Sequence, residues 1–240
     1  MTTQPDFLTL LGFGTQGWGF AMLSGARMTL GIALASFLFG GIIGTVVAWA
    51  KIKGGRLVKW FATAFTTVFR GVPDLLIVYL FYFGSSSLVA PVARALGNPE
   101  VTTLPGFLAG ILAVGTVSGA YQTEVLRGAF WTIKRGELEA ATASGMGTLL
   151  KFRRIIVPLT LRNAIPNLGN VWQFTLKDTA LISVIGVIDT VRQAQMGAGA
   201  THRPFPFFFA AGIAFLLITT LSGFAFRRAD AFFRKDGTRS

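Results

Sequence analysis

The sequence predicts an all-α integral membrane protein with five transmembrane helices, the N-terminus outside and the C-terminus in the cytoplasm. Two bulk properties indicate a membrane protein: 52% of its 240 residues are hydrophobic and only 13% are charged, whereas a soluble domain carries about 25% charged residues. Mean hydropathy is correspondingly +0.60. The orientation follows from the cations, because 16 of the 22 Lys and Arg residues fall in segments predicted to be cytoplasmic and four in outer ones.

Composition excludes several kinds of partner and site. The net charge of +12 does not require nucleic acid, since anionic phospholipid attracts the same cytoplasmic cations. The absence of Cys from the sequence excludes disulfides and thiolate metal sites. His202, the single histidine, lies in a predicted outer loop and cannot form a metal site alone.

Residues 1–27 are expected to form a short lead-in at the outer surface, without a cleavable signal peptide, because no Lys or Arg precedes Arg27. The first predicted span, Met28–Ala50, is long enough at ~1.5 Å per residue to cross a ~30 Å hydrocarbon layer. Small residues recur at every fourth position along it: Ser36, Gly40, Gly44 and Ala48. This face predicts close helix packing, either with a partner subunit or, as we favour, within the subunit.

The following segment is predicted to be cytoplasmic because it carries four cations: Lys51, Lys53, Arg56 and Lys59. We expect a helix near the inner interface over Leu57–Phe69, a break at Arg70–Asp74, and a second span from about Pro73 to Ala93. Proline suits a helix start, where its missing N–H costs least. The alternative is one continuous span from Trp60 to Phe83. That span would bury two charges at a cost of several kcal/mol, so we prefer the break.

Three further spans complete the predicted topology. The third runs from Gly106 to about Leu126, after a turn-rich outer loop. The fourth runs from about Pro166 to Ile188, and the fifth from about Phe205 to Phe226. A polar segment, too charged to lie in hydrocarbon, separates the third span from the fourth.

This polar segment predicts a helical hairpin in the cytoplasm. Ala and Glu favour a helix over Glu137–Ser144, which Gly145 ends. Thr148 is expected to cap a second helix over Leu149–Ile156, and Pro158 to end or kink it. Such a hairpin is either a docking surface for another protein or an ordinary loop with a solvated charged face.

The spacing within the hairpin resembles the signature loop of ABC importer permeases, in which EAA, three residues, G, nine residues, I, one residue and LP follow in order. Glu139-Ala140-Ala141, Gly145, Ile155 and Pro158 match, and Val157 stands in place of the leucine. Further segments resemble the polar amino-acid branch, most of all permeases for histidine, other basic amino acids and opines: Arg70–Leu75, Gly119–Tyr121, Glu124, Arg127–Phe130 and Lys177–Leu181.

The resemblance implies a type I ABC importer permease fold in the bacterial inner membrane, over residues 28–230. A coupling loop would lie at about 134–158 and a cytoplasmic basic tail at 231–240. Two copies of a separate ABC ATPase would use ATP and Mg, whereas this chain would bind no cofactor. A periplasmic substrate-binding protein and a second homologous permease are also implied, a heterodimer being favoured over a homodimer. The ATPase-docking residues implied are Glu137, Glu139, Ala140, Ala141, Ser144, Gly145 and Pro158.

The sequence contains no Walker A, HExxH or GxSxG pattern, so we expect a non-catalytic subunit rather than an enzyme. The leading hypothesis is the importer subunit that forms the path for a polar or basic amino acid or an opine. An ion-coupled secondary amino-acid transporter is the alternative, although such carriers commonly show internal repeats. A non-transporting scaffold or sensor is a third interpretation.

Candidate path residues lie mainly on the predicted fourth span. Polar side chains facing lipid are costly, so a polar stripe there either lines the route of a zwitterionic solute or makes structural contacts between helices. A cationic solute would favour a carboxylate such as Asp189 or Glu124, although Glu124 can also pair with Arg127 across one turn. At ~100° per residue the stripe covers an arc of roughly 140°: Asn163, Asn167, Asn170, Gln173, Lys177 and Asp178.

Overall fold

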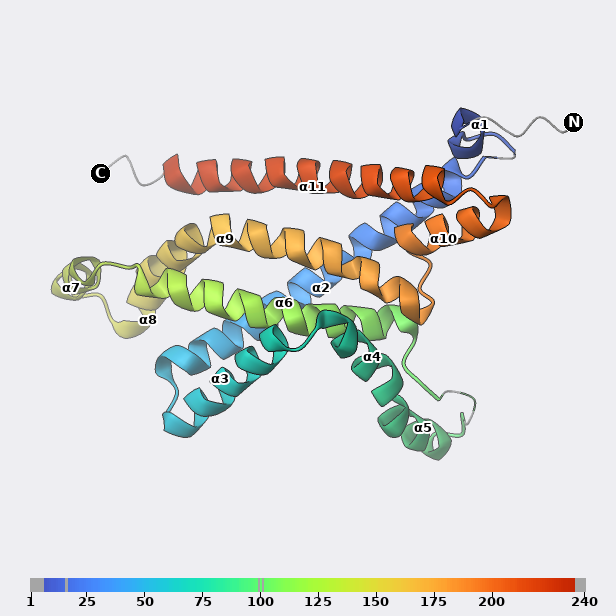
Figure 1. Ribbon diagram of the computed structural model, residues 1–240. Helices are drawn as coiled ribbons and strands as arrows, with labels where there is room; N and C mark the ends of the chain where they lie inside the picture. Colours follow the sequence, from blue (N-terminus) through green and yellow to red (C-terminus); the bar gives the residue numbers. More distant parts are fainter. Residues whose placement is uncertain (1–6, 16, 99, 101, 236–240) are drawn as a thin grey trace, which may run out of the picture. The chain divides into compact units, whose positions relative to one another are not determined.

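The computed structural model describes residues 7–15, 17–98, 100 and 102–235, and this part of the chain is helical without any β-strand (Figure 1). The all-α prediction is therefore confirmed. Three helical stretches within it are long and apolar enough to cross a membrane: Gly19–Lys53, Asp74–Ala95 and Pro204–Phe232. The first residues of the predicted lead-in and the last residues of the predicted tail lie outside the described part.

The chain divides into two compact units. Unit 1 comprises Met1–Ser36, Pro73–Gly115 and Thr175–Leu221, and unit 2 comprises Phe37–Val72, Thr116–Phe174 and Ser222–Ser240. Four long helices contribute residues to both units: α2 (Gly19–Lys53), α6 (Gly106–Trp131), α9 (Val157–Asp178) and α11 (Pro204–Lys235).

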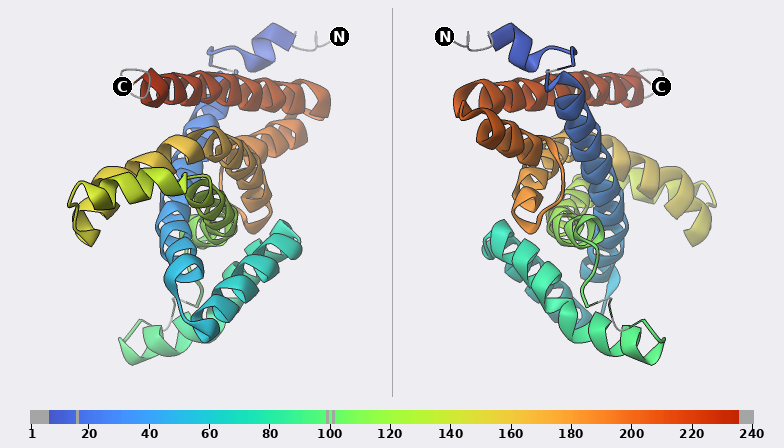
Figure 2. Two further views of the ribbon diagram at one scale, coloured as in Figure 1. Left: turned by 90° about the vertical axis from the view of Figure 1, so that its left-hand side faces the viewer. Right: turned by 90° about the vertical axis from the view of Figure 1, so that its right-hand side faces the viewer.

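Unit 1 is held together by a small apolar core at the start of α11. Phe207 is fully buried against Met22, Ala194 and Ala211. The Trp18 and Phe207 rings pack edge to face, with their centroids 5.6 Å apart. Figure 2 shows α10 beside the first turns of α11, in agreement with these contacts. The shorter elements of this unit are α1 (Phe7–Leu11), α4 (Asp74–Gly84), α5 (Ser86–Ala95), the 3-10 helix η2 (Thr179–Ile185) and α10 (Thr190–Thr201).

Unit 2 contains the close helix contact that the small-residue face of the first span predicted. A Cβ added to Gly44 on α2 would lie 2.8 Å from Cβ of Gln122 on α6, and one added to Gly119 would lie 3.1 Å from the Gly40 carbonyl oxygen. The small residues therefore serve packing within the subunit. The shorter elements here are α3 (Arg56–Gly71), α7 (Arg135–Ala143), α8 (Thr148–Lys151) and the π-helical segment η1 (Phe152–Ile156).

The predicted break after α3 is present, and the continuous-span alternative is wrong. Val72 leaves the helix with an extended backbone, and Pro73 is the N-cap of α4. The second predicted span, however, is not one helix: Ser85 separates α4 from α5. Its hydroxyl donates to the Tyr82 carbonyl oxygen at 2.6 Å and accepts from the Leu104 amide at 3.1 Å. Serine that bonds nearby backbone in this way competes with helix continuation.

The predicted ends of several helices are also wrong. Helix α2 begins at Gly19 rather than Met28, and α10 was not predicted. Thr148 makes no cap, because Gly147 is the N-cap of α8 and no side chain bonds there. The predicted fourth span shifts most: α9 runs from Val157 to Asp178 with Pro166 inside it, and the following residues form a 3-10 helix.

Pro158 neither ends nor visibly interrupts the helix. The chain continues from α8 through η1 into α9, with helical backbone angles at Val157. A π-helical turn widens the helix just before the proline, which is one way to accommodate a residue that has no N–H and a bulky ring. The prediction that Pro158 ends the helix is therefore wrong, because Val157 keeps helical backbone angles where the residue-before-proline rule disfavours them.

Candidate functional site

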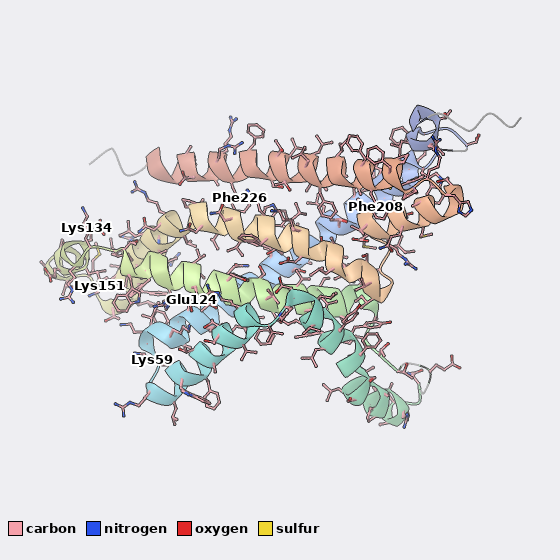
Figure 3. All side chains as sticks on the ribbon, in the orientation of Figure 1. Lys59, Glu124, Lys134, Lys151, Phe208 and Phe226 are labelled. Atoms are coloured by element: carbon pink, nitrogen blue, oxygen red, sulfur yellow. The ribbon has the colours of Figure 1, made fainter. Side chains whose placement is uncertain are left out.

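The polar hairpin of α7 and α8 is largely exposed. Four of the predicted docking residues on α7 and at its end are exposed: Glu137, Glu139, Ala140 and Ser144. Ala141 is buried, and α7 contacts both α8 and η1 within the hairpin. Figure 3 shows Lys134 and Lys151 on this hairpin. Lys151 Nζ donates to Thr142 Oγ1 at 2.9 Å and so ties the second helix to the first.

Gly145 fixes the turn between the two hairpin helices. Its φ is +75°, and the amides of Gly145 and Met146 donate to the carbonyl oxygens of Thr142 and Ala141 at 3.0 and 3.1 Å. This pair of bonds is a Schellman motif, which satisfies the last carbonyls of a helix and needs a left-handed residue. No atom lies within 4 Å of a Cβ built on Gly145, so the surface of the turn at Gly145 is open to a partner protein.

The hairpin is joined to the helix that precedes it and the helix that follows it. Asn163 Nδ2 on α9 donates to Thr132 Oγ1, just beyond α6, at 2.7 Å. Because the α8–η1–α9 helix is continuous, a displacement of the hairpin would be transmitted directly to α9. Pro158, one of the predicted docking residues, lies exposed in the first turn of α9.

A charge cluster joins α2, α3 and α6 within unit 2. Lys51 Nζ donates to Glu124 Oε1 at 2.5 Å and to Thr66 Oγ1 at 2.6 Å, and Arg127 Nη2 donates to Glu124 Oε2 at 2.7 Å. The Lys51 side chain is 9% exposed and that of Glu124 19%. The predicted pairing of Glu124 with Arg127 is confirmed. With two cations already bound to it, Glu124 has little remaining capacity for a cationic solute.

The polar stripe predicted on the fourth span lies on α9. Asn167, Asn170 and Lys177 are exposed, and Gln173 and Asp178 are partly exposed. The side chain of Asp178 is within electrostatic range of Asp74, an acidic residue far from it in the sequence. Most of this stripe is therefore accessible on the isolated chain.

Lys177 also lines a pocket of about 600 Å³ in unit 1. Phe208, labelled in Figure 3, contributes to this wall from α11. Apart from Lys177 and one hydroxyl the lining is apolar: Ala180, Val191, Phe208, Ala211, Gly212, Phe215, Leu216 and Thr219. The size lies within the ~300–1,000 Å³ typical of small-molecule sites.

Asp189 has a structural role that sequence reasoning missed. It is the N-cap of α10, and Oδ1 accepts from the Arg192 amide at 2.8 Å. The side chain is fully buried beside the Thr29–Thr190 hydroxyl pair, which share a hydrogen bond of 2.7 Å. An aspartate followed by threonine after an apolar run is itself a recognisable N-cap signal.

Three further contacts were not predicted. The Arg70 guanidinium lies over the Tyr121 ring, 5.2 Å from its centroid, and Tyr121 stacks on Phe174 at 6.4 Å. The third contact is the pairing of Lys51 with Glu124. None of the three leaves a sequence signal, because the partners lie on different helices far apart in the chain.

Comparison with known proteins agrees with these features. The family model for binding-protein-dependent transport system inner membrane components matches residues 38–235. The octopine transport system permease protein OccQ of Rhizobium meliloti is 49% identical over 225 residues, which cover 94% of this chain and 95% of the relative. The histidine/lysine/arginine/ornithine transport system permease protein HisQ of Escherichia coli is 39% identical, over 86% and 90% of the two chains.

The fold agrees as well. A crystal structure of an amino acid ABC transporter with histidines aligns with a TM-score of 0.78 and 28% identity, over 96% of this chain and 99% of that one. A chain of the inward-facing MetNI methionine ABC transporter aligns with a TM-score of 0.69 at 16% identity, which shows the common fold alone.

The all-helical fold and the family match place this chain in the permease class of transport subunits. The chain belongs to the family of binding-protein-dependent transport system inner membrane components. It is a membrane-embedded permease subunit of an ABC importer, and the secondary-carrier hypothesis is not favoured. Permeases of this family bind no cofactor themselves.

Proposed function

We propose that this permease forms part of the translocation path for a basic amino acid or an opine. The relatives that support this are named for octopine and for histidine, lysine, arginine and ornithine. These solutes share a zwitterionic amino-acid end and, in most cases, a cationic side chain. Lys177 could attract the carboxylate, and the nearby acidic pair, Asp74 and Asp178, could attract the cation.

In the proposed topology five spans cross the bacterial inner membrane, with the N-terminus outside and the C-terminus inside. The 16-to-4 distribution of Lys and Arg supports this orientation. A periplasmic binding protein would deliver the solute, and a second homologous permease, distinct rather than identical, would complete the path. Residues 134–158 would then lie in the cytoplasm.

The exposed Schellman-closed hairpin is the single observation that carries the mechanism. Each of two ATPase copies would bind such a hairpin through its exposed docking residues: Glu137, Glu139, Ala140, Ser144, Gly145 and Pro158. The buried Ala141 would support them from inside the hairpin. ATP binding would draw the ATPases together and displace the hairpin. Because α8, η1 and α9 are continuous, α9 would move with it and change the accessibility of Asn167, Asn170 and Gln173. Such switching requires that ATP and solute each favour one state over the other.

The docking proposal is tested by two nearly isosteric variants, Gly145→Asp and Gly145→Asn. Both side chains tolerate the left-handed backbone better than other non-glycine residues, and neither Cβ would meet an atom within 4 Å. They differ in one negative charge at the proposed ATPase surface. We expect Gly145→Asp to reduce ATP-driven uptake and ATPase binding at least tenfold relative to Gly145→Asn, with equal amounts in the membrane. Equal uptake by the two variants would contradict the assignment of Gly145.

The path proposal has its own test. Gln173→Leu and Asn170→Leu should abolish uptake while the complex still assembles and hydrolyses ATP. Leu168→Asn, at a partly exposed position of α9 outside the stripe, is the control for a change of polarity on the same helix. Uptake that persists in both stripe variants would assign the stripe to contacts between subunits.

A further inference from the structure

An open apolar groove lies in unit 2 between α2, the last turns of α6 and the junction of η1 with α9. Its volume is about 480 Å³. Two wall residues, Val46 and Trp49, are 64% and 45% exposed. The lining is apolar except for two threonines: Thr45, Val46, Ala48, Trp49, Ile52, Leu126, Phe130, Phe152, Ile156, Val157, Thr160 and Leu161.

The groove continues along α2 toward the middle of the chain's first span. A second hollow of about 520 Å³ shares Thr45 and Val46 with it and extends to Phe37. Together the two follow α2 from Phe37 to Ile52, about 22 Å at ~1.5 Å per residue. One leaflet of the hydrocarbon core is ~15 Å thick. The track is therefore long enough for an acyl chain to run from the membrane interface to the bilayer midplane.

The end of the groove nearest the hairpin carries a rim of cations. Lys53 and Arg56 follow Ile52, and Arg153 and Arg154 follow Phe152. All four are exposed, and none makes a side-chain hydrogen bond or ion pair with the described part of the chain. The wall segments 45–56, 126–131 and 148–162 contain no Asp or Glu. An apolar slot with an unneutralised cationic rim matches a ligand with an acyl chain and an anionic headgroup.

We propose that this groove is a binding site for an anionic phospholipid of the inner leaflet. One acyl chain lies along α2 from Ile52 toward Phe37, and the headgroup phosphate is bound by Lys53 and Arg153. The choice of leaflet depends on the orientation given under Proposed function. The Trp49 and Phe152 rings pack edge to face, with their centroids 5.1 Å apart. A lipid in this groove therefore contacts the π-helical turn between the hairpin and α9.

Trp49 provides a direct measurement. The full-length chain, assembled with its ATPase and partner permease, is reconstituted in phosphatidylcholine vesicles. Phosphatidylglycerol or phosphatidylcholine with brominated acyl chains is then added as the quencher. Trp49 fluorescence is obtained as the difference between wild type and Trp49→Phe, since the chain contains five Trp residues. We expect brominated phosphatidylglycerol to quench Trp49 at lower mole fraction than brominated phosphatidylcholine.

The charge rim is tested by substitution. Lys53→Gln and Arg153→Gln should each weaken phosphatidylglycerol quenching about fivefold, since a basic residue near the headgroups contributes about 1 kcal/mol. Lys59→Gln, on α3, removes the same charge from a residue that lines neither hollow and should leave quenching unchanged (Figure 3). Thr45→Phe should reduce quenching by both lipids because it fills the groove, whereas Leu34→Phe, on the exposed part of α2 outside it, should not.

Three results would overturn the proposal. Equal quenching by the two lipids would exclude a preference for anionic headgroups. Loss of quenching in Lys59→Gln as large as in Lys53→Gln would reduce the effect to general surface charge. Absence of Trp49 quenching in the assembled complex would show that a protein subunit covers the groove. Since quenching is measured without transport, any of these results leaves the proposed import function intact, and failed transport leaves the lipid measurement valid.

Discussion

The Glu124 cluster yields the most quantitative prediction, because each of its members can be changed separately. Lys51 is 9% exposed and has two partners, the Glu124 carboxylate and the Thr66 hydroxyl. Glu124→Gln removes the negative charge and leaves Lys51 charged and almost buried. Removing one partner of a buried ion pair costs about 3–5 kcal/mol. Because Glu124 is 19% exposed and Arg127 is 42% exposed, we expect the lower end of that range, about 3 kcal/mol.

Lys51→Met should cost less, about 1 kcal/mol, because it removes the buried charge together with its hydrogen bonds and leaves Glu124 paired with Arg127. The double variant should resemble Lys51→Met. Its cost of about 1 kcal/mol, compared with about 4 kcal/mol for the sum of the two single variants, corresponds to a coupling energy of about 3 kcal/mol, at the upper end of the usual range for residues in contact.

The measurement is reversible unfolding of the purified chain in mixed micelles, followed by helical circular dichroism as the fraction of denaturing detergent rises. Glu139→Gln, an exposed glutamate on α7, is the matched control and should change the unfolding free energy by less than about 0.5 kcal/mol. The reasoning fails if Glu124→Gln costs no more than Glu139→Gln. It also fails if the double variant costs the sum of the two single ones.

Three further predictions concern packing and protonation. Gly44→Ala places a Cβ 2.8 Å from Cβ of Gln122 and should destabilise the fold by about 1–3 kcal/mol through overpacking. Gly197→Ala places a Cβ 2.3 Å from the fully buried Phe207 ring and should destabilise it by a similar or larger amount, measured in the same unfolding experiment. Burial raises the pKa of Asp189, which lies outside the proposed spans, to about 6, while the backbone amides that it accepts from oppose the shift. Its usual pKa is about 3.9 in the unfolded chain, so its favourable contribution is complete below pH ~4 and is lost as pH rises through 6. The unfolding midpoint should therefore rise as the pH falls from 7 to 5, and Asp189→Asn should remove that rise.

Each of these has a control in the same chain. Gly31→Ala on α2 and Gly199→Ala on α10 add a Cβ where no atom lies within 4 Å and should leave stability unchanged or slightly improved. Asparagine caps a helix about as well as aspartate, so Asp189→Asn retains α10 while it abolishes the titration. If the glycine variants match their controls, or the pH dependence survives in Asp189→Asn, the corresponding contact or titration is misassigned.

The features that sequence alone determined are those encoded by local chemistry. Hydrophobic length and the scarcity of charge predicted a helical membrane protein. Glycine at 145 predicted the end of α7, and Arg70–Asp74 predicted a break, because charge and proline act on their own few residues. The spacing around Glu139-Ala140-Ala141 indicated the permease family, since six matching residue types at fixed distances are an unlikely coincidence.

Tertiary structure decided the features that depend on neighbours distant in the chain. Ser85 separates α4 from α5 through a bond to Leu104, and Lys51 meets Glu124 only because α2 and α6 pack through Gly44 and Gly119. The sequence also did not determine how the helix continues past Pro158. The residue-before-proline rule describes only Val157 and Pro158, and it does not predict the π-helical turn that precedes them. Hydrophobic patterning therefore predicts which segments are helical, whereas the positions where helices bend, join and pair their buried charges depend on which side chains face one another across the fold.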